Sequence, residues 1–167
     1  MALRPARTMR AIKGQPWTRT SRSRPRKSYV KGVPNTKVRQ FNMGTDKRFD
    51  LEIDLVSNQS LNIRDNSLES GRQALLKYLE RNLIDNFFLT LLVFPHHVIR
   101  EHSASGVAGA DRISKGMKLA FGKPKGRAAR IYEGQTIFRI RVMKDALPIV
   151  KESCRRGQAK LSSTYTL

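Results

Sequence analysis

Apolar and polar residues alternate in the middle of the chain in patterns that predict one strand and one helix. From Phe49 to Val56 apolar side chains occupy every second position and acidic residues fill the gaps. This alternation predicts a strand with one face in water. From Ser67 to Asn82 apolar residues recur at helical spacing, and Asn66 with Glu69 has the spacing of a capping box at the start of that helix. The leucines on its predicted buried face are Leu68, Leu75, Leu76, Leu79 and Leu83.

Further along, short apolar runs predict more strands. Phe87 to Phe94 and His97 to Glu101 are strand-like and are divided by Pro95. Proline cannot donate a ladder hydrogen bond, so it separates the two runs. We therefore expect two consecutive strands here.

The C-terminal third predicts a hairpin and a second helix. Arg127 to Glu133 and Gln135 to Met143 flank Gly134, which is typical of a β-hairpin. A helix is predicted from Ala146 to Arg156, and Gly157 would end it. These elements predict an α+β fold, with two main helices on a mostly antiparallel sheet.

Positive charge dominates the two flanks of the chain. Lys and Arg total 33 against 13 Asp and Glu, for a formal net charge of +20. Residues 1–48 contain fourteen basic residues and one acidic residue, whereas residues 49–99 contain four and seven. A chain with this charge repels itself unless a polyanion neutralises it. Nucleic acid and anionic membrane are the two polyanions to consider.

The sequence favours nucleic acid over membrane. Phe87 to Pro95, the longest apolar run, is broken by Thr90 and is far shorter than the roughly 20 residues that span a bilayer. The N-terminus is charged from Arg4 onward and has no apolar segment of the secretory type behind it. Cys154 is the single cysteine, which excludes an internal disulfide. We expect a cytoplasmic protein without a membrane contact.

Residues 1–48 are predicted to form a basic RNA-binding arm. Four prolines and the absence of any helical or strand period argue against a core of their own. Trp17 and Tyr29 stand among basic residues, a pattern suited to base stacking beside phosphate contacts. A disordered basic tail or a nuclear-import-like run explains the composition equally well. The predicted RNA contacts of the chain are Arg4, Arg7, Arg10, Trp17, Arg19, Arg22, Arg24, Arg26, Lys27, Lys123, Lys125, Arg127, Arg139 and Arg141.

A long connection between predicted strands, His102 to Gly126, contains five glycines and a single acid, Asp111. Connections of this length in a small domain are usually functional or disordered. Glycines permit close backbone approach to phosphates, and the basic side chains of this segment would hold them. A solvated connection without function is the plain alternative.

Enzyme and other binding-site interpretations have weak support. His96 and His97 are adjacent, so on a strand they point to opposite faces and are poorly placed to share a metal. Gly106 to Gly109 has the spacing of a KH loop, but the flanking helices are missing. Phe121 to Gly126 resembles a phosphate loop only loosely, because Pro124 removes an amide donor. We therefore expect no enzyme, no metal site and no cofactor.

Several short sequence blocks together span most of the chain. They are RPAR at Arg4–Arg7, GVP at Gly32–Pro34, FPHHVIR at Phe94–Arg100, GVAGADR at Gly106–Arg112, Gly116–Met117, AFGKP at Ala120–Pro124, and Ala129–Arg130. In this order the blocks resemble the archaeal and eukaryotic ribosomal protein L-ten-e family, whose bacterial counterpart is L-sixteen. GADR and AFGKP are the most specific of them.

The resemblance implies a fold and a place in the ribosome. It implies an α/β-hammerhead-like domain over 49–160, after the arm at 1–48 and before a tail at 161–167. It implies binding to large-subunit ribosomal RNA, including 5S ribosomal RNA, near the central protuberance and the aminoacyl-tRNA site. Aminoacyl and peptidyl tRNA and neighbouring ribosomal proteins would be further partners. The chain ends soon after the last predicted helix, which favours an archaeal over a eukaryotic member.

The resemblance also implies a functional loop at 102–118, directed toward the peptidyl transferase centre. Its predicted tRNA-proximal residues are His102, Gly106, Gly109, Ala110, Asp111, Arg112, Lys115 and Lys118. Peptide-bond chemistry would belong to the RNA, and the protein would position RNA and tRNA. A free-standing RNA-binding regulator or chaperone would have the same charge profile. Copurification with large subunits through a high-salt wash would distinguish the two, since scattered phosphate contacts weaken steeply with salt.

Overall fold

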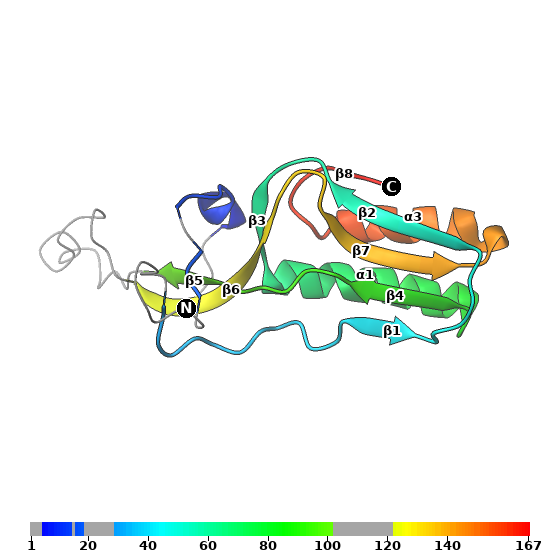
Figure 1. Cartoon of the computed structure of the whole chain (residues 1–167), viewed down its shortest axis with the longest axis horizontal. Helices are drawn as coiled ribbons and strands as arrows, with labels where there is room; N and C mark the ends of the chain where they lie inside the picture. Colours follow the sequence, from blue (N-terminus) through cyan, green and yellow to red (C-terminus); the bar gives the residue numbers. More distant parts are fainter. Residues whose placement is uncertain (1–4, 15, 19–28, 102–121) are drawn as a thin grey trace, which may run out of the picture.

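The computed structural model describes residues 5–14, 16–18, 29–101 and 122–167 of the chain (Figure 1). The helices and strands follow one another along these residues as listed at the end of this paragraph. Within the described residues, no helix combines the length and the apolar character needed to cross a membrane. In chain order the elements are η1 (Ala6–Met9), β1 (Asn42–Gly44), β2 (Leu51–Ser57), β3 (Leu61–Arg64), α1 (Asp65–Leu83), β4 (Phe87–Leu91), β5 (His97–Glu101), β6 (Lys123–Ile131), β7 (Thr136–Val142), η3 (Lys144–Ala146), α3 (Leu147–Gln158) and β8 (Tyr165–Thr166).

The described strands form two antiparallel sheets. The larger sheet has the order β1-β4-β7-β2-β8, and the smaller has the order β3-β6-β5. In Figure 1 helices α1 and α3 lie behind the larger sheet, and β5 and β6 of the smaller sheet lie toward the other end of the molecule. The predicted α+β class, with two main helices and antiparallel sheets, is confirmed.

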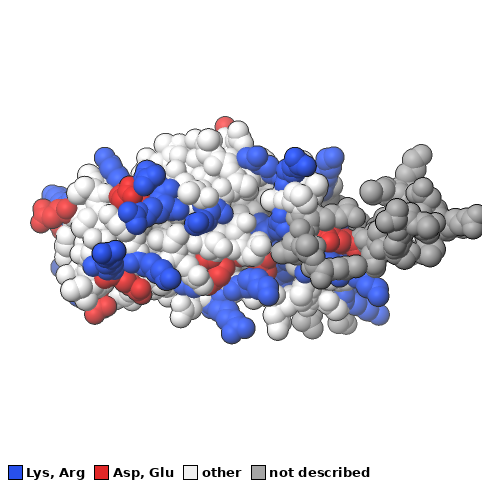
Figure 2. Space-filling view, turned by 180° about the vertical axis from the view of Figure 1, so that it is seen from behind, with Lys and Arg blue, Asp and Glu red and all other residues white. Residues whose placement is uncertain are grey.

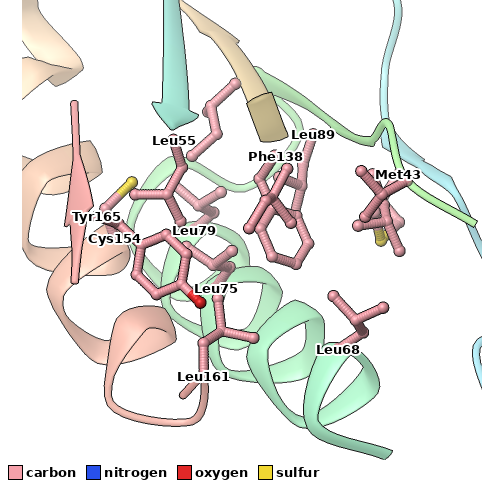
Figure 3. Close-up of a cluster of buried hydrophobic side chains, with 14 of the residues drawn as sticks. Met43, Leu55, Leu68, Leu75, Leu79, Leu89, Phe138, Cys154, Leu161 and Tyr165 are labelled. Carbon is pink, nitrogen blue, oxygen red and sulfur yellow. The ribbon is translucent and has the colours of Figure 1, made fainter. Parts of the chain in front are cut away.

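The core lies between the larger sheet and the two helices. Leu68, Leu75 and Leu79 of α1 are fully buried, as are Phe138 and Ile140 of β7. Figure 3 shows the α1 leucines meeting the sheet residues in one continuous cluster. Fully burying one such side chain stabilises the fold by about 1.5–3 kcal/mol. The predicted buried face of the first helix is therefore confirmed at these three leucines.

Helix α3 continues past the residue that was predicted to end it. Gly157 is buried inside the helix, and a Cβ atom there would lie 2.7 Å from Cγ of Leu75 on α1. Ser153 Oγ, one turn earlier, donates a hydrogen bond to the Leu75 carbonyl oxygen at 3.2 Å. The helix ends at Gln158, so the predicted end at Gly157 is wrong. Glycine is needed at position 157 for the close approach of the two helices, not for a turn that ends the helix.

The predicted hairpin around Gly134 is wrong in its pairing. Gly134 does lie in a turn, with φ at +77°. However, β6 pairs with β3 and β5, whereas β7 pairs with β2 and β4. The chain therefore crosses from the smaller sheet to the larger one at this turn. Alternation along each strand identifies its buried face but not its neighbours, so the sequence pattern could not distinguish the two arrangements.

The predicted capping box at the start of the first helix is also wrong. Helix α1 begins at Asp65, whose carboxylate accepts hydrogen bonds from the backbone N–H groups of Asn66 at 2.9 Å and Lys37 at 3.0 Å. Glu69 instead forms an ion pair with Arg72. Because the helix begins at Asp65, Asn66 is already inside it and Glu69 lies beyond the position from which a side chain can reach back to the N-cap backbone N–H.

Segments predicted to lie outside the domain contribute to its core. Val38 and Met43 are buried in the main cluster, and β1 pairs with β4. At the other end Leu161 and Tyr165 are buried too, and β8 pairs with β2. The divisions expected at residues 48 and 160 therefore do not separate packed from unpacked chain. Isolated apolar residues among basic ones carry no periodic signal by which the sequence could have shown this.

Candidate RNA interface

The smaller sheet holds the N-terminal segment by hydrogen bonds to its backbone. Asn62 of β3 makes three bonds to carbonyl oxygens of Met9–Ala11, at 2.8 to 3.0 Å, two from its side-chain amide and one from its backbone N–H. Arg130 of β6, the register partner of Asn62, donates from Nη2 to both carbonyl oxygens of Lys13–Gly14 at 2.9 Å. Two adjacent side chains of the sheet thus fix the path of residues 9–14.

Trp17 extends the same segment to strand β5. Its backbone N–H donates to Nδ1 of His97 at 3.0 Å, and its carbonyl oxygen accepts from the Val98 N–H at 2.7 Å. The Arg100 guanidinium lies 4.4 Å from the centroid of the Trp17 ring, a cation–π contact. Burial, and secondly the positive charge of Arg130, lowers the pKa of His97 to about 4. His97 is therefore neutral near pH 7, as its role as a hydrogen-bond acceptor requires.

Strands β5 and β6 close the base of the segment 102–121. Glu101 is the register partner of Lys123, and Arg100 Nε donates to the Gly122 carbonyl oxygen at 2.9 Å. A Cβ atom on Gly122 would overlap the backbone of Glu101, so a larger residue does not fit there. The segment must leave and rejoin the smaller sheet at one end, and β6 begins at that end.

Basic side chains gather at this end of the sheet. Lys123 and Lys125 are exposed, and Arg127 is half-buried with its Nε donating to the Pro34 carbonyl oxygen at 2.7 Å. A hollow of about 260 Å³ lies between β6, the first residues of α1 and the segment 34–37. Cations beside the start of a helix favour the binding of an anion such as phosphate. The charged residues lining the hollow are Lys37, Arg64, Lys125 and Arg127, with Asp65 and Glu101.

The arginines of β7 are already paired within the protein. Both Nε and Nη2 of Arg139 donate to the Asp54 carboxylate at 2.9 Å, and Nε also lies 3.0 Å from Glu52. The hydrogen bonds from Arg139 hold the pKa of the Asp54 carboxyl below its usual range. Arg141 Nη1 lies 3.2 Å from Asp46. The acidic partners offset the charge of these arginines, so the positive potential at this part of the larger sheet is much weaker than two unpaired arginines would produce.

The described residues offer electrostatic binding rather than reactive chemistry. Within them, no group of three or more His, Cys, Asp or Glu side chains could hold a metal ion. Burial raises the pKa of the Cys154 thiol to about 12, so it is not a thiolate near pH 7. What the smaller sheet does supply is a fixed set of cations and hydrogen-bond donors.

Comparison with known proteins decides the family. Residues 15–167 match the family described as ribosomal protein L16p/L10e. The chain belongs to this family. It is 42% identical over 163 residues to the large ribosomal subunit protein uL16 of Archaeoglobus fulgidus, an alignment covering 96% of this chain and 89% of that protein. The uL16 proteins of Hyperthermus butylicus and Pyrobaculum calidifontis are 42% identical over 157 and 167 residues, covering 93% and 96% of this chain and 83% and 90% of theirs.

Membership of the L16p/L10e family confirms the resemblance on which the sequence prediction relied. The relatives named above are ribosomal proteins of archaea. The expected class, a structural ribosomal protein and not an enzyme, follows from this membership.

The structure brings some of the predicted RNA contacts of this L16p/L10e protein together and separates others. Arg139 and Arg141 lie apart on the larger sheet. Trp17 is half-buried, and Arg100 covers one face of its ring. At the smaller sheet lie Arg10, Trp17, Lys123, Lys125 and Arg127, and Arg7 lies in η1, just before the residues bonded to Asn62. Outside the described residues are Arg4, Arg19, Arg22, Arg24, Arg26 and Lys27, and all the predicted tRNA-proximal residues, His102, Gly106, Gly109, Ala110, Asp111, Arg112, Lys115 and Lys118.

The sequence patterns did not reveal the residues that hold this interface together by hydrogen bonds. Asn62, Arg100 and Arg130 hold the N-terminal segment and the base of the 102–121 segment. One signal for Arg130 existed, because it is a single charged residue within the apolar run that ends β6. Nothing local marks Asn62, since its three bonds reach residues more than fifty positions away.

Proposed function

We propose that this chain, a structural protein of the large ribosomal subunit, binds ribosomal RNA through the smaller sheet and the N-terminal segment docked on it. The proposal rests mainly on one observation: Lys123, Lys125 and Arg127 lie on β6 where the 102–121 segment rejoins the smaller sheet, and Lys125 and Arg127 line one hollow with Met9 of the N-terminal segment. The net charge of +20 supports the same role, as do the relatives, which are large ribosomal subunit proteins. Such cations give affinity by displacing counterions from phosphates.

We further propose that the protein lies near the central protuberance and the aminoacyl-tRNA site of the large subunit. Large-subunit ribosomal RNA, 5S ribosomal RNA, aminoacyl and peptidyl tRNA and neighbouring ribosomal proteins are its partners. Loop 102–118 points toward the peptidyl transferase centre and helps to position tRNA, and the protein also supports subunit assembly. Support comes from the GADR and AFGKP blocks of the loop region and from the paired strands that hold the loop's base.

A salt titration tests the RNA contact of the smaller sheet. The variant R10Q/K123Q/K125Q removes three exposed cations there, and K47Q/K144Q/K151Q removes three exposed cations beside the larger sheet and on α3 as a matched control. Binding to in vitro transcribed large-subunit ribosomal RNA is measured across a salt series. Each lost phosphate contact lowers the slope of log affinity against log salt by about 0.7 to 0.9. We expect a decrease of about 2 to 3 for the first variant; equal slopes for both variants would contradict the proposed surface.

A deletion tests the loop. Removal of Ser103 to Ser114 should leave the thermal midpoint of the free protein nearly unchanged, because the entropy of closing a connection depends only weakly on its length and changes by tenths to about 1 kcal/mol. Ribosomes that carry the deletion should retain the protein but accommodate tRNA or form peptide bonds more slowly. Wild-type rates would refute a role in tRNA handling. Loss of the protein from the subunit would instead identify the loop as an anchor.

A further inference from the structure

A second basic surface lies on the helices, away from the smaller sheet. Gly157 lets α3 pack closely against Leu75 of α1, and beside this contact the two helices leave a groove of about 660 Å³. In Figure 2, which views the molecule from behind Figure 1, basic side chains are spread over this side. The groove is lined by Ala74, Lys77, Tyr78 and Arg81 of α1 and by Arg155, Arg156, Ala159 and Lys160 at the end of α3.

Part of this charge is balanced within the protein. Arg155 donates to both carboxylate oxygens of Glu152, at 2.7 and 2.8 Å, and Arg156 Nε donates to the same carboxylate at 2.8 Å. These bonds lower the pKa of Glu152 to about 2, so it stays ionised near pH 7. Two arginines share one carboxylate, which leaves a net positive charge. Cations in the last turn of α3 also interact favourably with the helix dipole, and that alone could explain their presence.

The remaining cations of the groove are not balanced by acidic partners, although Arg81, in the last turn of α1, also interacts favourably with its helix dipole. Lys77, Arg81 and Lys160 are exposed, and within the described residues no acidic side chain forms an ion pair with any of them. Lys77 and Arg81 are four residues apart on α1, about 6 Å along the helix axis. The groove therefore has cations on both walls, and no acidic residue lines it.

Tyr78 gives the groove an aromatic element. The Arg156 guanidinium lies 4.2 Å from the centroid of its ring. This cation–π contact, together with the bond from Nε to Glu152, fixes the plane of the guanidinium. Its Nη atoms have no hydrogen-bond partner among the described residues. A planar guanidinium held in this way suits the bidentate recognition of phosphate oxygens.

We propose that the α1–α3 groove binds the sugar–phosphate backbone of an RNA segment other than the one held by the smaller sheet, so that the protein bridges two RNA segments. This inference rests on the proposed function, since it assumes an RNA partner. The charge pattern favours RNA over an acidic helix as the occupant. A docked helix needs apolar anchors in its groove, whereas the uncharged residues here are the small Ala74 and Ala159 and Tyr78, whose ring is in cation–π contact with Arg156.

The first test is a salt titration of the full chain with large-subunit ribosomal RNA transcribed in vitro. The variant K77Q/R81Q/K160Q removes the three unpaired cations, all exposed, and its fold is checked by far-UV circular dichroism and thermal unfolding. We expect the slope of log affinity against log salt to decrease by about 2 to 3. The matched control K47Q/K144Q/K151Q, which changes exposed residues outside the groove and the smaller sheet, should keep a slope close to that of the wild type.

The second test locates the partner in assembled subunits. A photoreactive phenylalanine analogue replaces Tyr78, and the crosslinked product is identified. Crosslinks to ribosomal RNA, at a site different from those obtained from position 123, would support bridging. A crosslink to a ribosomal protein would overturn the proposal in favour of a protein partner. A single shared RNA site would also overturn it.

The outcomes separate this inference from the proposed function. If K77Q/R81Q/K160Q binds RNA with the wild-type slope while R10Q/K123Q/K125Q does not, the groove is not an RNA surface and the smaller sheet still is. If the wild-type protein shows no salt-dependent RNA binding at all, the proposed function itself fails. Loss of slope in both triple variants, with the control unaffected, is the result expected of a protein with two RNA-binding surfaces.

Discussion

Gly157 and Gly71, on facing helices, should respond in opposite ways to the same substitution by alanine. A Cβ atom on Gly157 would lie 2.7 Å from Cγ and 3.0 Å from Cδ2 of Leu75, which is fully buried. A Cβ atom on Gly71 would lie 3.2 Å from Cδ2 of Leu161, near the end of a less buried side chain that can move. The predicted difference between the two alanine variants depends on this contrast.

The magnitudes follow from two opposing terms. Alanine is favoured over glycine inside a helix by about 1 kcal/mol, and by less near a helix end such as position 157. Forcing an extra methyl group into a packed core costs about 1–3 kcal/mol. For Gly71→Ala the first term dominates, and we expect an unchanged or slightly higher unfolding free energy. For Gly157→Ala the second dominates, and we expect a loss of about 1–2 kcal/mol.

Urea unfolding of the free protein, followed by far-UV circular dichroism, measures both variants. A double-mutant cycle with Leu75→Ala isolates the contact. Leu75→Ala alone should cost about 2–5 kcal/mol, and in that background Gly157→Ala should become neutral or stabilising. The coupling energy should then be about 1–3 kcal/mol, typical of residues in contact. If Gly157→Ala is as stable as the wild type, or if its cost is the same with Ala at position 75, the close-packing explanation of Gly157 is wrong.

Three further predictions concern the core and the Trp17 contact. Leu79→Ala should lower the unfolding free energy by about 2–5 kcal/mol, and Lys151→Ala on the exposed side of α3 should change it by no more than about 0.5 kcal/mol; equal effects would mean that the buried face was misassigned. Cys154, buried and with its pKa raised to about 12, should react with a thiol reagent at neutral pH only as fast as the protein unfolds, so a rate that does not change with urea would disprove its burial. The pKa of His97 is about 4 in the folded protein, below its ordinary value of 6.5. Between these two values the unfolded or undocked form binds more protons than the folded form. The Trp17 contact should therefore be fully stable above pH 6.5 and be lost as the pH falls toward 4. Fluorescence of Trp17, the single tryptophan of the chain, should change across this range in the wild type but not in His97→Gln, and the same titration in both would exclude His97 as the cause.

The elements that the sequence predicted well are those whose signal is local and periodic. Leucines at helical spacing identified α1 and its buried face, and alternation identified the inward residues of β2 and β7. Strand partners were not predictable in this way, because two strands with the same alternation can join one sheet or two. The turn at Gly134 shows this: the sequence located the turn, and tertiary packing decided that its flanking strands belong to different sheets.

The candidate interface was predictable in its chemistry and not in its geometry. Excess Lys and Arg indicated a phosphate-binding protein, since charge is additive along a sequence and needs no fold to be counted. Which cations remain available depends on contacts between distant positions. Arg139 is paired with Asp54, 85 positions away, whereas Lys77 and Arg81 have no acidic partner within the described residues. The sequence prediction included Arg139 among the binding residues and left out the two on α1. Only cations that the fold leaves unpaired are free to bind phosphate. The expected RNA contacts therefore lie less on the larger sheet and more on the helices than the sequence indicated.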